Sequence, residues 1–120
     1  DSDLRLKENI QQLPKGLEDI LKLKPYKYNY KDDNETKHYG FVAQELNDIL
    51  PILVSSINDD AEETLTVNIT EIIPILVKAI QEQQTLIDSQ KSKIENLETA
   101  VLAIQNQLGL RVDHSTQAGE

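Results

Sequence analysis

The most regular pattern along the chain lies in its second half, where apolar residues recur at alternating spacings of three and four. This spacing is a heptad repeat held over about five heptads, and it predicts a coiled coil. We expect one helix from Thr70, as its N-cap, to Leu108, with Pro74 close enough to the start to remove little hydrogen bonding. The repeated positions are Ile73, Leu76, Ile80, Gln83, Ile87, Gln90, Ile94, Leu97, Val101, Ile104 and Leu108.

The residues at these positions bear on the number of strands in the coil. Each heptad has two core positions, a and d. The a position, which comes first, is mostly β-branched, whereas the d position is mixed and is glutamine twice, at Gln83 and Gln90. Two-stranded coiled coils favour β-branched residues at a with leucine at d. The mixed d positions therefore indicate a shared core wider than that of a two-stranded coil. Parallel strands would also bring Lys93 opposite Glu98 of a neighbouring chain. We therefore predict a parallel homotrimer, with a buried stripe widened by the apolar flanks Val77, Ala79, Leu86 and Ala100.

The first seventy residues mix short helical and strand patterns, so the predicted fold class is α+β with a long C-terminal helix. We expect a small mixed unit over 1–69, the coiled-coil helix over 70–109 and a disordered polar tail over 110–120. The elements expected in the small unit are a short helix with Leu17, Ile20 and Leu21 on one face, a hairpin of strands at 26–30 and 38–42, a helix over 43–50 ended by Pro51, and a strand pair at 52–54 and 64–67.

Composition and charge narrow the classes of partner. The 120 residues include 21 acidic and 12 basic side chains, for a net charge of −9, so we expect neither nucleic acid nor an anionic membrane as a partner. There is no cysteine, and His38 and His114 are too few for a histidine cage, so we expect no metal and no cofactor. Apolar residues make up 38% of the chain, which is thin for one core and indicates that burial is completed between chains.

One pair near the N-terminus, Ser2 and Lys7, has the chemistry of a nucleophile and its base. A serine hydroxyl attacks when a neighbouring base takes its proton, and a lysine amine serves as that base where desolvation or positive charge favours its neutral form. The positive charge of Arg5 and the desolvation expected on assembly of the chains would both favour the neutral form of the Lys7 amine. Serine and lysine five residues apart are common, so the spacing alone does not separate a catalytic pair from two surface residues.

Four blocks of sequence carry a resemblance to a known family. The first block is Ser2-Asp3-x-Arg5-x-Lys7-Glu8-Asn9-Ile10, and the others lie at 21–30, 38–46 and 67–81. Together they resemble the intramolecular chaperone auto-processing domain, the peptidase S74 family, which phage endosialidases, tail fibres and myelin regulatory factors carry. The resemblance covers about residues 2 to 87, and the heptads that follow suit the trimeric helical stalk of that family.

The resemblance implies a self-cleaving chaperone that trimerises, assists folding of an upstream β-rich fibre of the same polypeptide, and then releases itself. By the family pattern Ser2 is the nucleophile and Lys7 the general base, and the bond cut lies at Ser2. We favour the Asp1–Ser2 bond, because a hydroxyl reaches the preceding carbonyl through a five-membered ring. The implied location is the host cytoplasm during virion assembly, with release from the virion tail after cleavage.

Two other functions remain open at this point, a trimerisation cap that is never cut and a coiled-coil adaptor for a helical partner. Assistance to cleavage by His38, Gln44 or Glu45 also stays open, although packing is the role that their strand and helix positions favour. Because the chain lacks an initiator methionine, we expect it to be a piece of a longer polypeptide.

Overall fold

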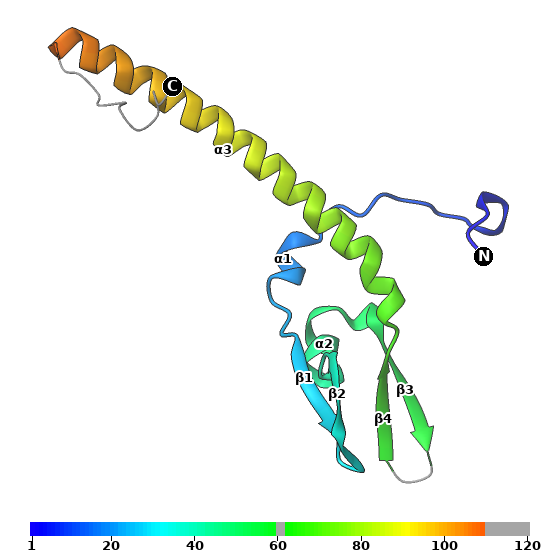
Figure 1. The fold of residues 1–120 in the computed structure, drawn as a ribbon. Helices are drawn as coiled ribbons and strands as arrows, with labels where there is room; N and C mark the ends of the chain where they lie inside the picture. Colours follow the sequence, from blue (N-terminus) through cyan, green and yellow to red (C-terminus); the bar gives the residue numbers. More distant parts are fainter. Residues whose placement is uncertain (60–61, 110–120) are drawn as a thin grey trace. The chain divides into compact units, whose positions relative to one another are not determined.

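A computed structural model describes residues 1–59 and 62–109 (Figure 1). The chain divides into two units, residues 1–83 and residues 84–120, each of which is described by itself. The predicted disordered tail, including His114, lies outside the described residues. In chain order the elements are the 3-10 turn η1 (Leu4–Leu6), α1 (Leu17–Ile20), β1 (Tyr26–Tyr30), β2 (Asp33–Gly40), α2 (Ala43–Ile49), the 3-10 turn η2 (Pro51–Leu53), β3 (Val54–Asp59), β4 (Glu62–Val67), the 3-10 turn η3 (Ile69–Glu71) and α3 (Ile72–Leu108).

The first hairpin forms where alternating tyrosines predict it. β1 pairs antiparallel with β2, with Tyr26 opposite Gly40 and Tyr28 opposite His38. The returning strand was expected over 38–42 but runs over Asp33–Gly40, so it begins earlier and ends before Phe41 and Val42. The turn is confined to residues 31–32, and the Asp33 carboxylate accepts hydrogen bonds from the backbone amides of Glu35 and Thr36, both at 3.2 Å. This hairpin carries the tyrosines and His38 on one ribbon.

The second hairpin corrects one expected strand. β3 and β4 pair antiparallel from Val54 opposite Val67, but residues 51–53 form the turn η2 instead of a strand. Proline has no N–H to donate to a strand ladder, and its fixed φ suits the first position of a helical turn, which explains the change. The turn places Leu53 at the centre of the unit with no exposed surface.

The core of residues 1–83 forms between α2, η2 and the start of α3. The predicted helix over 43–50 is confirmed to Ile49, and the apolar side chains that end it enter the core. Because leucine and isoleucine side chains gain about 1.5–3 kcal/mol each on full burial, this cluster is the main source of stability in the unit. The buried cluster consists of Leu46, Leu50, Leu53, Ile72 and Ile75.

The long helix α3 confirms the helix that the heptads predict. It runs for 37 residues, which at about 1.5 Å per residue is roughly 55 Å. Thr70 as its N-cap is wrong, because Thr70 lies inside the turn η3, whose last residue leads directly into the helix. The Ile72 amide donates to the Ile69 and Thr70 carbonyls, so the turn η3 itself supplies backbone acceptors at the start of the helix.

The first turns of α3 carry two apolar stripes. Ile72, Ile75 and Ala79 are buried within their own chain. Ile73 and Ile80, one residue further along, stay exposed. Because each residue turns a helix by about 100°, the two stripes lie on adjacent faces. Ala79 is only 4% exposed in the single chain, so its expected place on the flank of an interchain stripe is wrong.

Candidate functional site

The predicted nucleophile and base lie on an exposed N-terminal arm, residues 1–15. Ser2 and Lys7 flank the short turn η1, whose N-cap is Asp3: its carboxylate accepts the Arg5 amide at 2.9 Å. The Lys7 amide closes the turn by donating to the Leu4 carbonyl at 3.1 Å. The local sequence therefore folds the chain between Ser2 and Lys7 into one tight turn.

Arg5 is paired inside this turn. Its Nε and a terminal guanidinium nitrogen donate to the two carboxylate oxygens of Asp3 at 3.1 and 2.7 Å. This hydrogen bonding lowers the pKa of the Asp3 carboxyl and raises the pKa of the Arg5 guanidinium. The positive charge that the sequence offers to Lys7 is thus compensated by Asp3.

Within residues 1–59 and 62–109, no hydrogen bond joins Ser2 to Lys7, and both side chains are exposed. Two residues after Lys7 the arm turns at Asn9, whose φ of 53° is the left-handed region that asparagine tolerates better than most residues. Further on, Gln12 and Leu13 line a shallow groove with Pro74 and Val77 of α3. The arm is therefore exposed where it carries Ser2 and Lys7, and it lies beside α3 at Gln12 and Leu13.

His38 and Glu45 are both engaged in packing the first hairpin. The His38 ring stacks on Tyr28 with centroids 5.5 Å apart and meets the edge of Tyr30 at 5.2 Å. The Glu45 carboxylate accepts the Tyr26 hydroxyl at 2.9 and 3.0 Å, and this hydrogen bond raises the pKa of that phenol. Gln44 is exposed on α2. These contacts hold β1 against β2 and α2.

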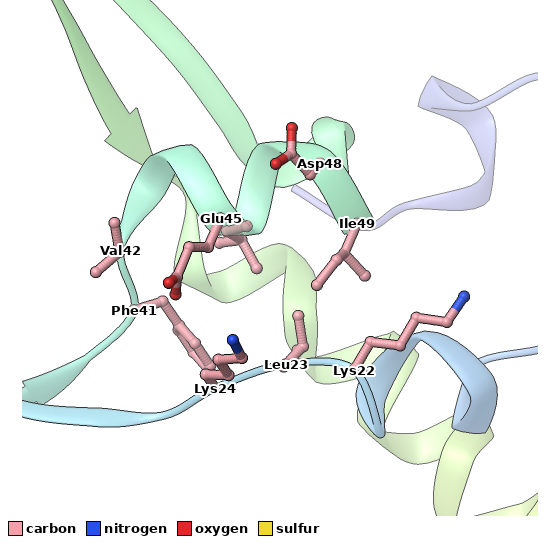
Figure 2. Close-up of a pocket in the computed structure, with 9 residues that line it drawn as sticks. Lys22, Leu23, Lys24, Phe41, Val42, Glu45, Asp48 and Ile49 are labelled. Carbon is pink, nitrogen blue, oxygen red and sulfur yellow. The ribbon is translucent and has the colours of Figure 1, made fainter.

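A depression of about 270 Å³ lies between α2 and the segment that precedes β1 (Figure 2). Leu23, Phe41 and Ile49 contribute apolar surface to it, and Glu45 extends toward it from α2 (Figure 2). Its lining contains no serine, and Ser2 and Lys7 are not part of it. The depression therefore offers no serine nucleophile and does not bring the predicted pair together.

The largest unusual surface is the heptad row of α3. Its nine apolar members each keep between 38% and 65% of their surface exposed in the single chain. Large apolar side chains rarely line up in water over such a length, so the row is a candidate interaction surface. The members are Ile73, Leu76, Ile80, Ile87, Ile94, Leu97, Val101, Ile104 and Leu108.

No helix in the described ranges 1–59 and 62–109 has both the length and the apolar character needed to cross a membrane. Nor do the described residues contain a group of three histidine, cysteine, aspartate or glutamate side chains placed to hold a metal ion.

The fold defines a class: a small mixed α+β domain joined to a long heptad-bearing helix. Residues 2–55 match the family model of peptidase S74, described as the chaperone of endosialidase. The resemblance drawn from the sequence is confirmed, and these residues belong to the chaperone-of-endosialidase family.

Three relatives are similar to this chain over most of its length. It is 36% identical to the long tail fiber protein Gp37 of Enterobacteria phage M1 over 99 residues, which cover 78% of this chain. It is 37% identical to Gp37 of Enterobacteria phage Ox2 over 97 residues, 76% of this chain. It is 29% identical to myelin regulatory factor homolog 1 of Caenorhabditis elegans over 121 aligned residues, 92% of this chain. The matched region covers 39% of each Gp37 protein and 13% of the worm protein.

Proposed function

We propose that this chain is an intramolecular chaperone that forms a parallel homotrimer, assists folding of an upstream fibre segment, and releases itself by cleavage at Ser2. Membership of the chaperone-of-endosialidase family and the similarity to two long tail fiber proteins support a role associated with a fibre of the virion tail. The upstream fibre segment is the partner, and the reaction is a single turnover within one polypeptide.

The observation that carries the proposal is the exposed heptad row of α3. Its β-branched first positions and its glutamines at Gln83 and Gln90 favour a core wider than that of a dimer. Association of three chains along this row would remove nine apolar side chains per chain from water. At about 25 cal/mol per Å² of apolar surface, this burial is a strong driving force for association.

The proposed coiled coil would set the register of the three chains, which the fibre segments lack when they begin to fold. Three long chains that wind into one β-fibre must begin in register, and loop-closure entropy makes such long-range initiation slow. A helical coil sets register through local contacts and raises the effective concentration of the segments joined to it. Removal of the chaperone after folding would leave the fibre kinetically trapped.

The cut follows from the chemistry of Ser2 and Lys7. The neutral Lys7 amine takes the hydroxyl proton while the Ser2 oxygen attacks the Asp1 carbonyl carbon, and the Asp1–Ser2 C–N bond breaks as the nitrogen takes a proton. The ester that results is opened by water, which leaves a carboxylate on Asp1 and a free hydroxyl and amine on Ser2. Because both side chains are exposed in the single chain, desolvation of Lys7 would come from assembly.

The test is a pair of substitutions in the whole chain with a fibre segment attached before Asp1. Ser2→Ala removes the nucleophile, and Lys7→Met removes the base while keeping the aliphatic stem, so both should leave an uncleaved trimer. Ser89→Ala and Lys15→Met, at exposed positions outside the pair, should cleave like the unchanged chain. Product masses from mass spectrometry report the cut and its side of Ser2.

Three outcomes separate the alternatives. Release from Ser2→Ala shows that the pair is assigned wrongly. No release from the unchanged chain, together with a trimeric mass, favours the trimerisation cap that is never cut. A monomer that binds another helical protein favours the adaptor.

A further inference from the structure

The arm is fastened to the long helix at one glycine. Gly16, where the exposed arm meets α1, is buried, and a Cβ placed on it would lie 2.6 Å from the Ile75 carbonyl oxygen. The same atom would lie 3.2 Å from the Ala79 nitrogen. Gly16 has an extended φ of −156°, so this close approach to the backbone of α3, and not its conformation, requires glycine.

A carboxylate from α3 holds the same point. One oxygen of Glu82 accepts the Gly16 amide at 2.5 Å and the Leu17 amide at 3.2 Å. The residues lie 66 and 65 positions apart in the sequence, so the bond joins the base of the arm to the helix. Hydrogen bonds to a charged, half-buried acceptor are among the stronger ones in proteins.

Glu82 is placed between the two apolar stripes of α3. It follows Ala79 by three residues on the buried stripe, and it directly precedes Gln83 of the exposed heptad row. The turn that carries Glu82 therefore also carries Gln83, which would face the other chains in the proposed trimer.

Fastening residue 16 limits where the chemistry can occur. Ser2 lies fourteen positions before Gly16, and a fully extended stretch of that length reaches at most about 50 Å. The groove that Gln12 and Leu13 share with Pro74 and Val77 removes further freedom. A point of attachment at the base of the arm therefore reduces the volume that Ser2 and Lys7 search.

We propose that Glu82 is a positioning residue for self-cleavage: by accepting the Gly16 and Leu17 amides it fastens the arm to the turn of α3 that would enter the coil, so that Ser2 and Lys7 meet in the assembled molecule. This inference rests on the proposed function. Glu82 does not touch the reacting atoms. Its effect is to join the base of the arm to the turn of α3 that would enter the coil.

The test measures the cleavage rate of the whole chain with a fibre segment attached before Asp1. Glu82→Ala should slow cleavage by roughly 100-fold, the size expected when reacting groups are misplaced by about 1 Å. Glu82→Gln keeps a carbonyl oxygen that accepts both amides, so it should cleave within about threefold of the unchanged chain. Gly16→Ala, which forces residue 16 away from Ile75, should be slow like Glu82→Ala.

Glu95→Ala is the matched control. Glu95 is an exposed glutamate of the same helix outside the heptad row, and the change alters helix propensity equally. It should leave the rate unchanged. Faster hydrogen exchange of the Gly16 and Leu17 amides in Glu82→Ala, at an unchanged trimer mass and melting temperature, would locate the effect at the attachment.

The results separate this inference from the proposed function. Full-rate cleavage of Glu82→Ala, beside an inactive Ser2→Ala, overturns the positioning role and leaves the dyad standing. Loss of the trimer or of the melting transition in Glu82→Ala also overturns it, since Glu82 would then be structural. Slow cleavage in both Glu82→Ala and Glu82→Gln excludes the acceptor role. No cleavage of the unchanged chain overturns the proposed function and the positioning role with it.

Discussion

Replacing Ile87 with aspartate places a carboxylate in the middle of the exposed heptad row of α3. In the single chain Ile87 is 52% exposed, so the aspartate is solvated there and the monomer tolerates it. In the proposed trimer three such carboxylates would face one another inside the coil. The substitution therefore distinguishes a monomeric α3, which would be unaffected, from an α3 that associates with other chains through the heptad row, which would be disrupted.

The magnitude follows from the exposure of the isoleucine. Full burial of an isoleucine side chain is worth about 1.5–3 kcal/mol, so burying the remaining half contributes about 1 kcal/mol per chain, or about 3 kcal/mol per layer of three. Each unpaired carboxylate taken into the core costs several kcal/mol more. The sum reaches about 10 kcal/mol per trimer, which is roughly a 10⁷-fold loss in the association constant.

Light scattering measures the result directly, since the unchanged chain should have about three times its monomer mass of 13.6 kDa. Ile87→Asp should give the monomer mass. Ser92→Asp adds the same charge at an exposed position outside the row and should stay trimeric. A trimer that survives Ile87→Asp would refute the assignment of the row to the interface. An unchanged chain with twice the monomer mass would correct only the stoichiometry.

Two further predictions concern the stability of residues 1–83. Leu53→Ala, at a side chain with no exposed surface, should lower the free energy of unfolding by about 2–5 kcal/mol in urea, whereas Ile52→Ala beside it, at 72% exposed, should change it little. The raised pKa of Tyr26 means that its hydrogen bond to Glu45 stabilises the fold below the usual tyrosine pKa of about 10 and is lost as the pH rises through the raised value. Tyr26→Phe should therefore be less stable than the unchanged chain at pH 8 but not at strongly alkaline pH, and an equal difference at both would contradict this.

Patterns that repeat along the chain were sufficient to predict its long helix and its first hairpin. The heptads predict α3 because helix formation and apolar spacing are local properties. Alternation of Tyr26, Tyr28 and Tyr30 predicts β1 for the same reason. The expected strand over 52–54 is wrong at Ile52 and Leu53, because an apolar run fits a strand or a buried turn equally well and the preceding Pro51 favours the turn.

Contacts between distant residues could not be predicted in this way. The attachment of Gly16 to Glu82 joins residues 66 positions apart, and no local pattern marks either residue. One sign of packing was present in the sequence: Ile72, Ile75 and Ala79 form a second apolar stripe outside the heptad positions. That stripe shows, in retrospect, that the start of α3 is covered by its own chain.

The site residues were reached by resemblance, and the structure explains why spacing alone could not reach them. Ser2 and Lys7 are exposed on either side of η1, so neither burial nor a close partner marks them in a single chain. Asp3 compensates the nearby charge of Arg5. Under the proposed function the activating surroundings arise only on assembly, and no pattern within one chain encodes them.

Under the proposed function, the glutamines of the heptad row would specify the register of the three chains. In the proposed trimer Gln83 and Gln90 form two successive polar layers, with Leu76 before them and Leu97 after them. A chain that slips by one heptad would still present an apolar side chain at every first (a) position, where four isoleucines are followed by Val101 and Leu108, so these layers alone would tolerate the slip. The same slip sets one Gln90 against two Leu97 side chains and one Leu76 against two Gln83 side chains, which buries unpaired amides. Replacing both glutamines with leucine should therefore raise the stability of the coil and lower its fidelity of register.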